Sequence, residues 1–264
     1  IVLFIVTILT TLAVDQITNY SFYNEYILKQ DLSLRLAKPS LAHPFGCDEF
    51  GRDLLLRILW GTKLSFAIGV VAIALSVIMG APFGMIAAFY GGKTDNTIMR
   101  VMDVLLAVPY MLLAMAIVAA LGTSTFNLLL ALAVSGIAKY ARIARAAVLT
   151  VKDSEFVEAA RAVGASDGTI LFQYILPNAL APILVQVSLG IGDSILAVAG
   201  LSYLGLGVQP PQPEWGAILT TARTYMRDAW HISVFPGLFL ILAVIAFNLF
   251  GDGLRDALDP KLKR

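Results

Sequence analysis

The sequence predicts an all-α protein built as a polytopic transmembrane helical bundle of about six spans, and three observations support this. Of the 264 residues, 58% are hydrophobic and only 14% are charged, whereas a soluble domain usually carries about a quarter charged residues. The mean hydropathy is +0.81. The apolar residues also fall in long blocks, several of them close to the roughly 20 residues that cross a bilayer as a helix.

Six apolar blocks are predicted to form the spans. In chain order they are Ile1–Val14, Leu64–Tyr90, Val101–Leu121, Phe126–Ala138, Ala179–Val208 and Val234–Phe250. The first block is short, and we interpret it as the end of a transmembrane helix whose start precedes Ile1. A signal peptide is the alternative, although neither a charged leading region nor a small-residue cleavage site is visible. Together the blocks form a single transmembrane domain over residues 1–264.

The lysines and arginines favour a cytoplasmic C-terminus, because cytoplasmic loops carry an excess of these residues. This orientation places 11 of them in the cytoplasm and 8 on the opposite side. Residues 15–63 and 209–233 then become external segments, and the polar residues 139–178 become a cytoplasmic loop. The bias is modest, since the first external segment holds six of the eight external basic residues.

The polar loop contains signals for two short helices. Asp153 or Ser154 is expected to cap the first helix with its side-chain oxygen. Glu155 and Glu158 suit its first turns, where the helix dipole favours negative charge. Gly164 is expected to end it, because glycine readily adopts the left-handed conformation that closes a helix.

A second short helix is expected to follow directly. Ser166 is its predicted N-cap, with Asp167 in the first turn. Pro177 is predicted to end it, because the residue before a proline avoids the α region.

The surface of this helix pair is expected to carry small side chains. Ala159, Ala160, Ala162 and Ala165 would let another protein approach closely, and Glu158 would supply one orienting charge. A helix pair in a solvated loop is the alternative. Capped loops of this kind more often dock on something.

The stretch "EAARAVGASDGTILFQYILP" resembles the EAA loop of binding-protein-dependent ABC importer permeases. Glu158, Ala159, Ala160, Gly164, Leu176 and Pro177 fall on that pattern. Tyr174 stands where the pattern has isoleucine. The resemblance implies that this loop is a coupling helix seated in a groove of a cytoplasmic ATPase, with coupling residues Glu158, Ala159, Ala160, Gly164, Ala165, Asp167 and Pro177.

Three further stretches narrow the resemblance. "HPFGCDEFGRDLLLRILWG", "LSYLGLGVQPPQPEWGAIL" and "PGLFLILAVIAFNLFGDGLRDALDPKLKR" are similar, in this order, to the dipeptide/oligopeptide/nickel permease group, and in particular to its C-type subunit. Cys47 sits where that group more often has a small hydroxyl residue.

This resemblance implies a type I ABC importer permease fold in a bacterial or archaeal inner membrane. The implied partners are a second homologous permease, two cytoplasmic ABC ATPases and an external substrate-binding protein. Peptides, nickel and metal chelates remain open as cargo. The sequence holds no G-x-x-x-x-G-K-[ST] phosphate loop, so ATP and Mg²⁺ are expected on the ATPases, with no cofactor on this chain and no catalytic residue of its own.

Asp193 lies near the middle of the fifth predicted span. A carboxylate there costs on the order of 3 kcal/mol on insertion scales, so it should face the bundle interior or a water-filled path. It either lines the translocation path or makes a packing contact with a polar group of another span or of a partner subunit.

Other residues receive simpler interpretations. Arg52 and Arg57 are spaced for a short amphipathic helix that lies at the outer membrane surface or meets an external binding protein. Trp215, Trp230 and Tyr225 are expected to anchor the chain at the membrane interface. Docking of an external binding protein, which only the resemblance supports, is the alternative role for these aromatic residues. Gly80 and Gly84 form a small-xxx-small pair that lets another helix come close. His43 and His231 are too isolated to argue for a metal site. With a net charge of +1 and no basic patch, nothing suggests nucleic acid.

Two other classes of function are a stand-alone secondary transporter and a membrane enzyme. A stand-alone secondary transporter would use Asp193 for ion or proton coupling, but should show a repeat with matching broken helices, and none is found. A membrane enzyme would need a convergent set of reactive side chains inside the bundle. Neither class explains the capped helix pair.

Overall fold

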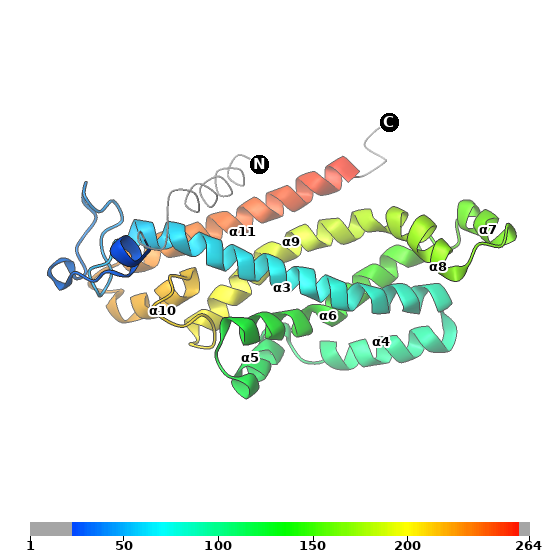
Figure 1. Ribbon diagram of the computed structural model, residues 1–264, viewed down its shortest axis with the longest axis horizontal. Coiled ribbons are helices and arrows are strands. Elements are labelled where there is room, and N and C mark those ends of the chain that lie inside the picture. The colour runs from blue at the N-terminus through cyan, green and yellow to red at the C-terminus, as the bar shows by residue number, and fades with distance from the viewer. Residues whose placement is uncertain (1–22, 259–264) are drawn as a thin grey trace. The chain divides into compact units, whose positions relative to one another are not determined.

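The computed structural model describes residues 23–258, and this part of the chain is built from helices and turns (Figure 1). The α-helices are α3 (Leu54–Tyr90), α4 (Gly92–Leu106), α5 (Tyr110–Leu121), α6 (Thr125–Leu149), α7 (Glu155–Ala162), α8 (Asp167–Thr169), α9 (Leu176–Tyr203), α10 (Trp215–Tyr225) and α11 (His231–Leu258). Short π or 3₁₀ turns are η1 (Tyr23–Leu28), η2 (Leu32–Leu34) and η3 (Ile170–Ile175). The predicted all-α class is therefore confirmed.

Within the described residues, four helices are long and apolar enough to cross a membrane, and a bent pair of helices would make five spans. The four are α3, α6, the continuous helix Asp167–Tyr203 and α11. The predicted first span, Ile1–Val14, lies outside the described residues.

The predicted span Val101–Leu121 is wrong in its form. It consists of the end of α4 and the whole of α5, which meet at a 79° bend. Pro109 stands directly before α5 and offers no backbone N–H, and it disfavours the helical conformation of the residue before it. The first residues of α4 are polar, so this helix is amphipathic and not apolar on all sides.

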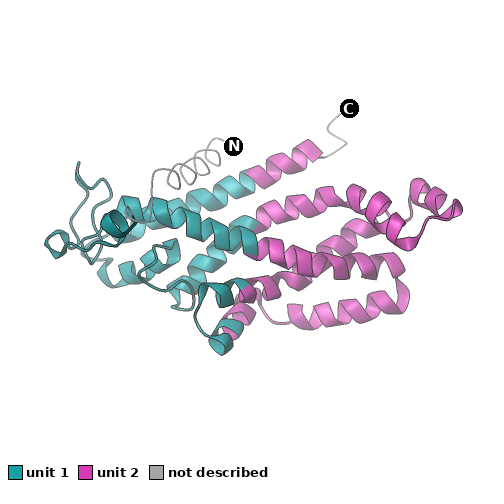
Figure 2. Cartoon of the chain, in the orientation of Figure 1, with its two compact units in different colours: residues 1–71, 117–129, 191–249 teal, residues 72–116, 130–190, 250–264 magenta. Residues whose placement is uncertain are grey.

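Two compact units divide the chain (Figure 2). The first contains residues 1–71, 117–129 and 191–249, and the second contains residues 72–116, 130–190 and 250–264. Each unit has its own apolar core.

Trp215 lies at the centre of the first unit. It is only 1% exposed, its Nε1–H donates to the Ile58 carbonyl at 3.0 Å, and its ring packs edge-on against Phe66 and Phe239. The predicted role of Trp215 as an interface anchor is therefore wrong. The reason is a set of contacts with residues distant in sequence, namely Ile58 and Phe66 of α3 and Phe239 of α11. The buried Glu214 caps the start of the same helix by accepting from the backbone N–H groups of Gly216 and Ala217. Trp230, in contrast, is exposed.

The predicted surface helix around Arg52 and Arg57 is also wrong. Both guanidinium groups are buried, and both lie beside the carboxylate of Asp48. A charged side chain can be buried when it is paired, and the sequence pattern did not reveal that the partner comes from the preceding turn. Arg57 lies in the first turn of α3, while Arg52 precedes the helix.

In the second unit, α3 and α6 come into backbone contact. A Cβ added at Gly80 would lie 2.3 Å from the Ile137 carbonyl oxygen, and one at Gly84 would lie 1.9 Å from that of Ala141. One turn earlier, the Ser76 hydroxyl lies 3.0 Å from the Ala133 carbonyl oxygen. The small-residue pair therefore does what the sequence predicted, and α6 is the helix that it admits.

We expect Gly84→Ala to destabilise the protein by about 1–3 kcal/mol, because its methyl group has no room against α6. Gly237→Ala is the matched control: it lies within α11 with open space around its Cβ position, and alanine favours a helix by about 1 kcal/mol over glycine. Thermal unfolding of both variants in lipid nanodiscs compares the two. Equal midpoints would contradict the close contact.

Candidate functional site

The capped segment, residues 153–178, begins with the amphipathic helix α7. Ser154 is its N-cap, as expected, but the hydroxyl makes no cap hydrogen bond and donates instead to the Val151 carbonyl at 2.7 Å. The predicted side-chain cap is therefore wrong, since the hydroxyl is engaged by the preceding turn. Glu155 and Glu158 lie in the first turn, where the dipole favours them.

Gly164 closes α7 as predicted. Its φ is +82°, with open space around it, so glycine is required there for its conformation and not for room. The Ala165 N–H donates to the Ala160 carbonyl at 3.1 Å and completes the closing turn.

The second half of the capped segment leads into a long helix. Ser166 caps α8 as predicted, with its Oγ accepting from the Thr169 N–H at 3.3 Å. Pro177 does not end the helix. It is the second residue of α9, within the continuous helix Asp167–Tyr203 and directly after the π-helical turn η3. A π-helical turn interrupts the regular hydrogen-bond ladder, which accommodates a proline that has no N–H to donate.

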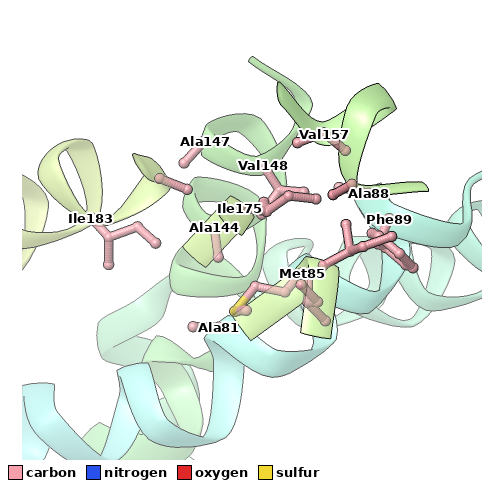
Figure 3. Packing of buried hydrophobic residues seen from close by; sticks show 14 residues of the cluster. Ala81, Met85, Ala88, Phe89, Ala144, Ala147, Val148, Val157, Ile175 and Ile183 are labelled. Atoms are coloured by element: carbon pink, nitrogen blue, oxygen red, sulfur yellow. The ribbon is translucent and has the colours of Figure 1, made fainter. Parts of the chain in front are cut away.

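One face of the capped segment is buried in a core cluster of the second unit (Figure 3). Two residues of this face, Val157 and Ala160, belong to α7. The other three, Ile170, Leu171 and Ile175, belong to η3. They pack against residues of α3, α6 and α9, namely Ala81, Met85, Ala88, Phe89, Ala144, Ala147, Val148, Ala179 and Ile183. We call this cluster the seat.

Two basic side chains contact the end of α3, Arg161 from the capped segment and Lys152 from the residue directly before it. Lys152 Nζ donates to the Ala88 carbonyl at 3.3 Å, and the Arg161 guanidinium lies 5.7 Å from the centre of the Phe89 ring. The capped segment is therefore in contact with α3 as well as with α6 and α9.

Ion pairs also hold α4 on α6, the helix that leads into the capped segment. Asp95 accepts two hydrogen bonds from Arg145, both 2.6 Å long, and Asp103 pairs with Arg142. The sequence placed Arg142 and Arg145 in a loop beyond Phe126–Ala138. That loop begins later, because α6 continues through alanine-rich turns to Leu149.

The residues predicted to couple this chain to an ATPase fall into an exposed group and a buried group. Glu158, Ala159, Gly164, Asp167 and Pro177 are exposed. Ala160 is 4% exposed and Ala165 packs on the seat, so these two do not present small side chains to a partner.

Three exposed apolar side chains of the capped segment were not predicted from the sequence. They are Phe156 (42% exposed), Val163 (83%) and Phe172 (63%). Phe156 and Val163 stand seven residues apart, a spacing that places both on the same face of a helix as Ala159. This spacing, offset from the buried Val157 and Ala160, is the signal that would have revealed them.

Asp193 lies on the exposed side of α9, while its neighbours Gly192 and Ser194 are buried. A carboxylate in the middle of a span does not face lipid without a large cost. The two roles predicted for Asp193, path lining and a packing contact with a polar group, both stay predictions.

The fold matches solved transporters. Inward-facing structures of the MetNI methionine ABC transporter align with a TM-score of 0.65 at 20% identity, covering 78% of this chain and 96% of theirs. This likeness shows the type I ABC importer permease fold.

Sequence comparison is more specific. The dipeptide transport system permease protein DppC of Alkalihalophilus pseudofirmus is 47% identical over 88% of this chain and 76% of its own length. The glutathione transport system permease protein GsiD of Pectobacterium atrosepticum is 49% identical over 85% and 75%. Residues 80–264, which include the seat and the capped segment, match the family model as well. The chain belongs to the family of binding-protein-dependent transport system inner membrane components.

Proposed function

We propose that this chain is a non-catalytic permease subunit of an ATP-driven importer of small peptides, and that the capped segment couples it to the ATPases. The observation that carries the proposal is that the capped segment has one buried face and one exposed apolar face. One side is fixed in the seat, and the other presents Phe156, Val163 and Phe172 beside Glu155 and Glu158. Exposed apolar groups of this kind next to charges suit a protein partner.

The seat supports a mechanical role. ATP and Mg²⁺ would bind on two cytoplasmic ATPase subunits, whose closure would push α7. Because packed cores favour discrete arrangements, the push would move α3, α6 and α9 together. Such a movement would rock the spans between inward-open and outward-open states.

The path and the remaining partners follow from the family. A second, homologous permease would complete the path, with Asp193 facing it, and an external binding protein would deliver the substrate. The excess of basic residues supports a cytoplasmic C-terminus in a bacterial or archaeal inner membrane. Relatives that carry dipeptides, D,D-dipeptides and glutathione in their names support a peptide substrate rather than nickel. Family membership does not favour a stand-alone secondary transporter.

We expect Glu158→Lys to uncouple uptake from ATP hydrolysis or to release the ATPases, while the chain still inserts. Losing a charge-assisted contact lowers affinity by roughly tenfold or more. Asp252→Lys, which reverses an exposed charge on α11, is the control. Peptide uptake and ATPase rates are measured in proteoliposomes. Rates like those of the unmodified protein in Glu158→Lys would rule out this contact.

Substitutions of two valines distinguish the proposed docking face from the face of the capped segment that is buried in the seat. Val163→Asp should leave thermal stability unchanged but reduce co-purification of the ATPases, because Val163 is exposed. Val157→Asp buries an unpaired charge, which costs several kcal/mol, so α7 should leave the seat and become sensitive to protease. Full recovery of the ATPases with Val163→Asp would contradict the docking face.

Asp193→Asn should change the kinetics of peptide uptake without releasing the ATPases, because it removes a charge from the side of α9 assigned to the path. Asp193→Glu keeps that charge and should transport at close to the normal rate. Uptake kinetics unaltered by the Asn variant would favour a packing role.

A further inference from the structure

One side of α11 carries a row of exposed, large apolar side chains. Between residues 230 and 249 they recur at spacings of three or four, which places them on one face of a helix. With the residue directly before the helix included, they are Trp230, Val234, Leu238, Ile241, Ile245 and Leu249, each between 44% and 55% exposed. We call this face the α11 stripe. The opposite side of the helix supplies Leu240, Ala243 and Phe247 to the core of the first unit.

The length of the α11 stripe matches the hydrocarbon layer of a bilayer. The Trp230 carbonyl accepts from the Val234 N–H at 3.0 Å, so Trp230 is joined to the first helical turn. From there to Leu249 the helix rises by about 28 Å at 1.5 Å per residue, and a hydrocarbon core is about 30 Å thick. The next exposed residues are Asp252, Gly253 and Arg255. The stripe therefore ends where polar and charged residues begin.

The composition of the α11 stripe favours lipid over another helix as its cover. Helices that pack on each other inside a membrane do so largely through small residues, as Gly80 and Gly84 of α3 do. None of the six residues of the stripe is glycine, alanine or serine. A tryptophan at the end of such a stripe is typical of the boundary between membrane and water.

Three exposed arginines surround the turn that leads into the stripe. Arg223 lies in the last turn of α10, Arg227 follows that helix, and Arg35 is the C-cap of η2. A small apolar cluster joins these segments. It consists of Leu36, Ala222, Tyr225, Ala229 and Ile232. The arginines are therefore held at one place by packing, although they come from distant parts of the sequence.

The guanidinium groups contact aromatic rings and not carboxylates. Arg35 Nη2 donates to the Tyr225 hydroxyl at 3.4 Å and lies over that ring. The Arg223 guanidinium lies 5.9 Å from the centre of the Tyr203 ring. Within residues 23–258, none of the three arginines forms an ion pair. The exposed Asp228 offsets one of their charges, so the turn keeps a net positive charge.

We propose that this turn, residues 223–230, binds the headgroup of an anionic phospholipid whose acyl chains lie along the α11 stripe. Arg223 and Arg227 would donate to the phosphate oxygens, because a guanidinium group matches a phosphate with two parallel hydrogen bonds. The Trp230 ring would lie at headgroup level. A headgroup with a net negative charge, such as that of phosphatidylglycerol, suits the arginines better than phosphatidylcholine, which brings its own cation. This inference does not rest on peptide transport or on the capped segment.

The test measures which lipid contacts Trp230. The full chain, with the partners that co-purify with it, is reconstituted in phosphatidylcholine vesicles that contain a fraction of brominated phosphatidylglycerol or of brominated phosphatidylcholine. Bromine near the headgroup end of an acyl chain quenches the fluorescence of a tryptophan beside it. The chain has three tryptophans, so Trp230→Phe is measured in parallel and the difference reports on Trp230.

We expect both brominated lipids to quench Trp230. Phosphatidylglycerol should do so as a lipid bound roughly fivefold or more tightly than phosphatidylcholine, because each arginine near a membrane surface favours an anionic lipid by about that factor. A high concentration of NaCl should lower this preference by screening. The salt measurement needs no variant.

Two variants locate the headgroup, and a third is the control. Arg223→Gln and Arg227→Gln should each lower the preference for phosphatidylglycerol by roughly fivefold at most, and together they should remove most of it. Both side chains are exposed, so the protein should still fold. Arg255→Gln removes an exposed arginine near the other end of α11 and should leave the preference unchanged.

Three results would overturn the proposal. Equal quenching of the unmodified protein and of Trp230→Phe would mean that a protein partner, and not lipid, covers this end of the stripe. Equal binding of the two lipids to the unmodified protein would rule out recognition of an anionic headgroup. A preference for phosphatidylglycerol that survives in the doubly substituted protein would place that headgroup elsewhere.

Discussion

The backbone contact between α3 and α6 is the constraint on which the rest of the second unit depends. Ser76, Gly80 and Gly84 stand about one helical turn apart on α3 and present a small side chain or none. The carbonyl groups of α6 occupy the space that larger side chains would need. Between transmembrane helices there is little hydrophobic force, so close packing of this kind provides much of the attraction. The same two helices continue into the seat, where Ala88 of α3 and Val148 of α6 belong to one buried cluster.

Much of this arrangement could be predicted from the sequence. The spans follow from apolar blocks of the right length, and Gly80 with Gly84 follows from their spacing. The capped segment follows from Ser166, Gly164 and the acidic first turn of α7. These features are local, since each depends on residues within one or two helical turns.

The errors arise from tertiary contacts that neither an apolar block nor a helical spacing reveals. Trp215 was taken for an anchor, because its partner Ile58 is 157 residues away. Ala160 was placed on the outer face, because helical spacing alone does not say which side of α7 meets the seat. Arg52 and Arg57 were read as exposed, since their burial depends on how the preceding turns fold back over Asp48. The bend at Pro109, in contrast, was visible in the sequence and was overlooked.

The composition of the seat has a consequence for how the protein is made. Its residues begin at Ala81 and end at Ile183, so four segments contribute to it. Synthesis runs from the N-terminus at about 5–20 residues per second, and α3 and α6 enter the membrane well before α9 exists. The seat around the buried face of α7 is therefore complete only after Ile183 has emerged from the ribosome. The docking face proposed for the ATPases thus receives its complete support late in synthesis.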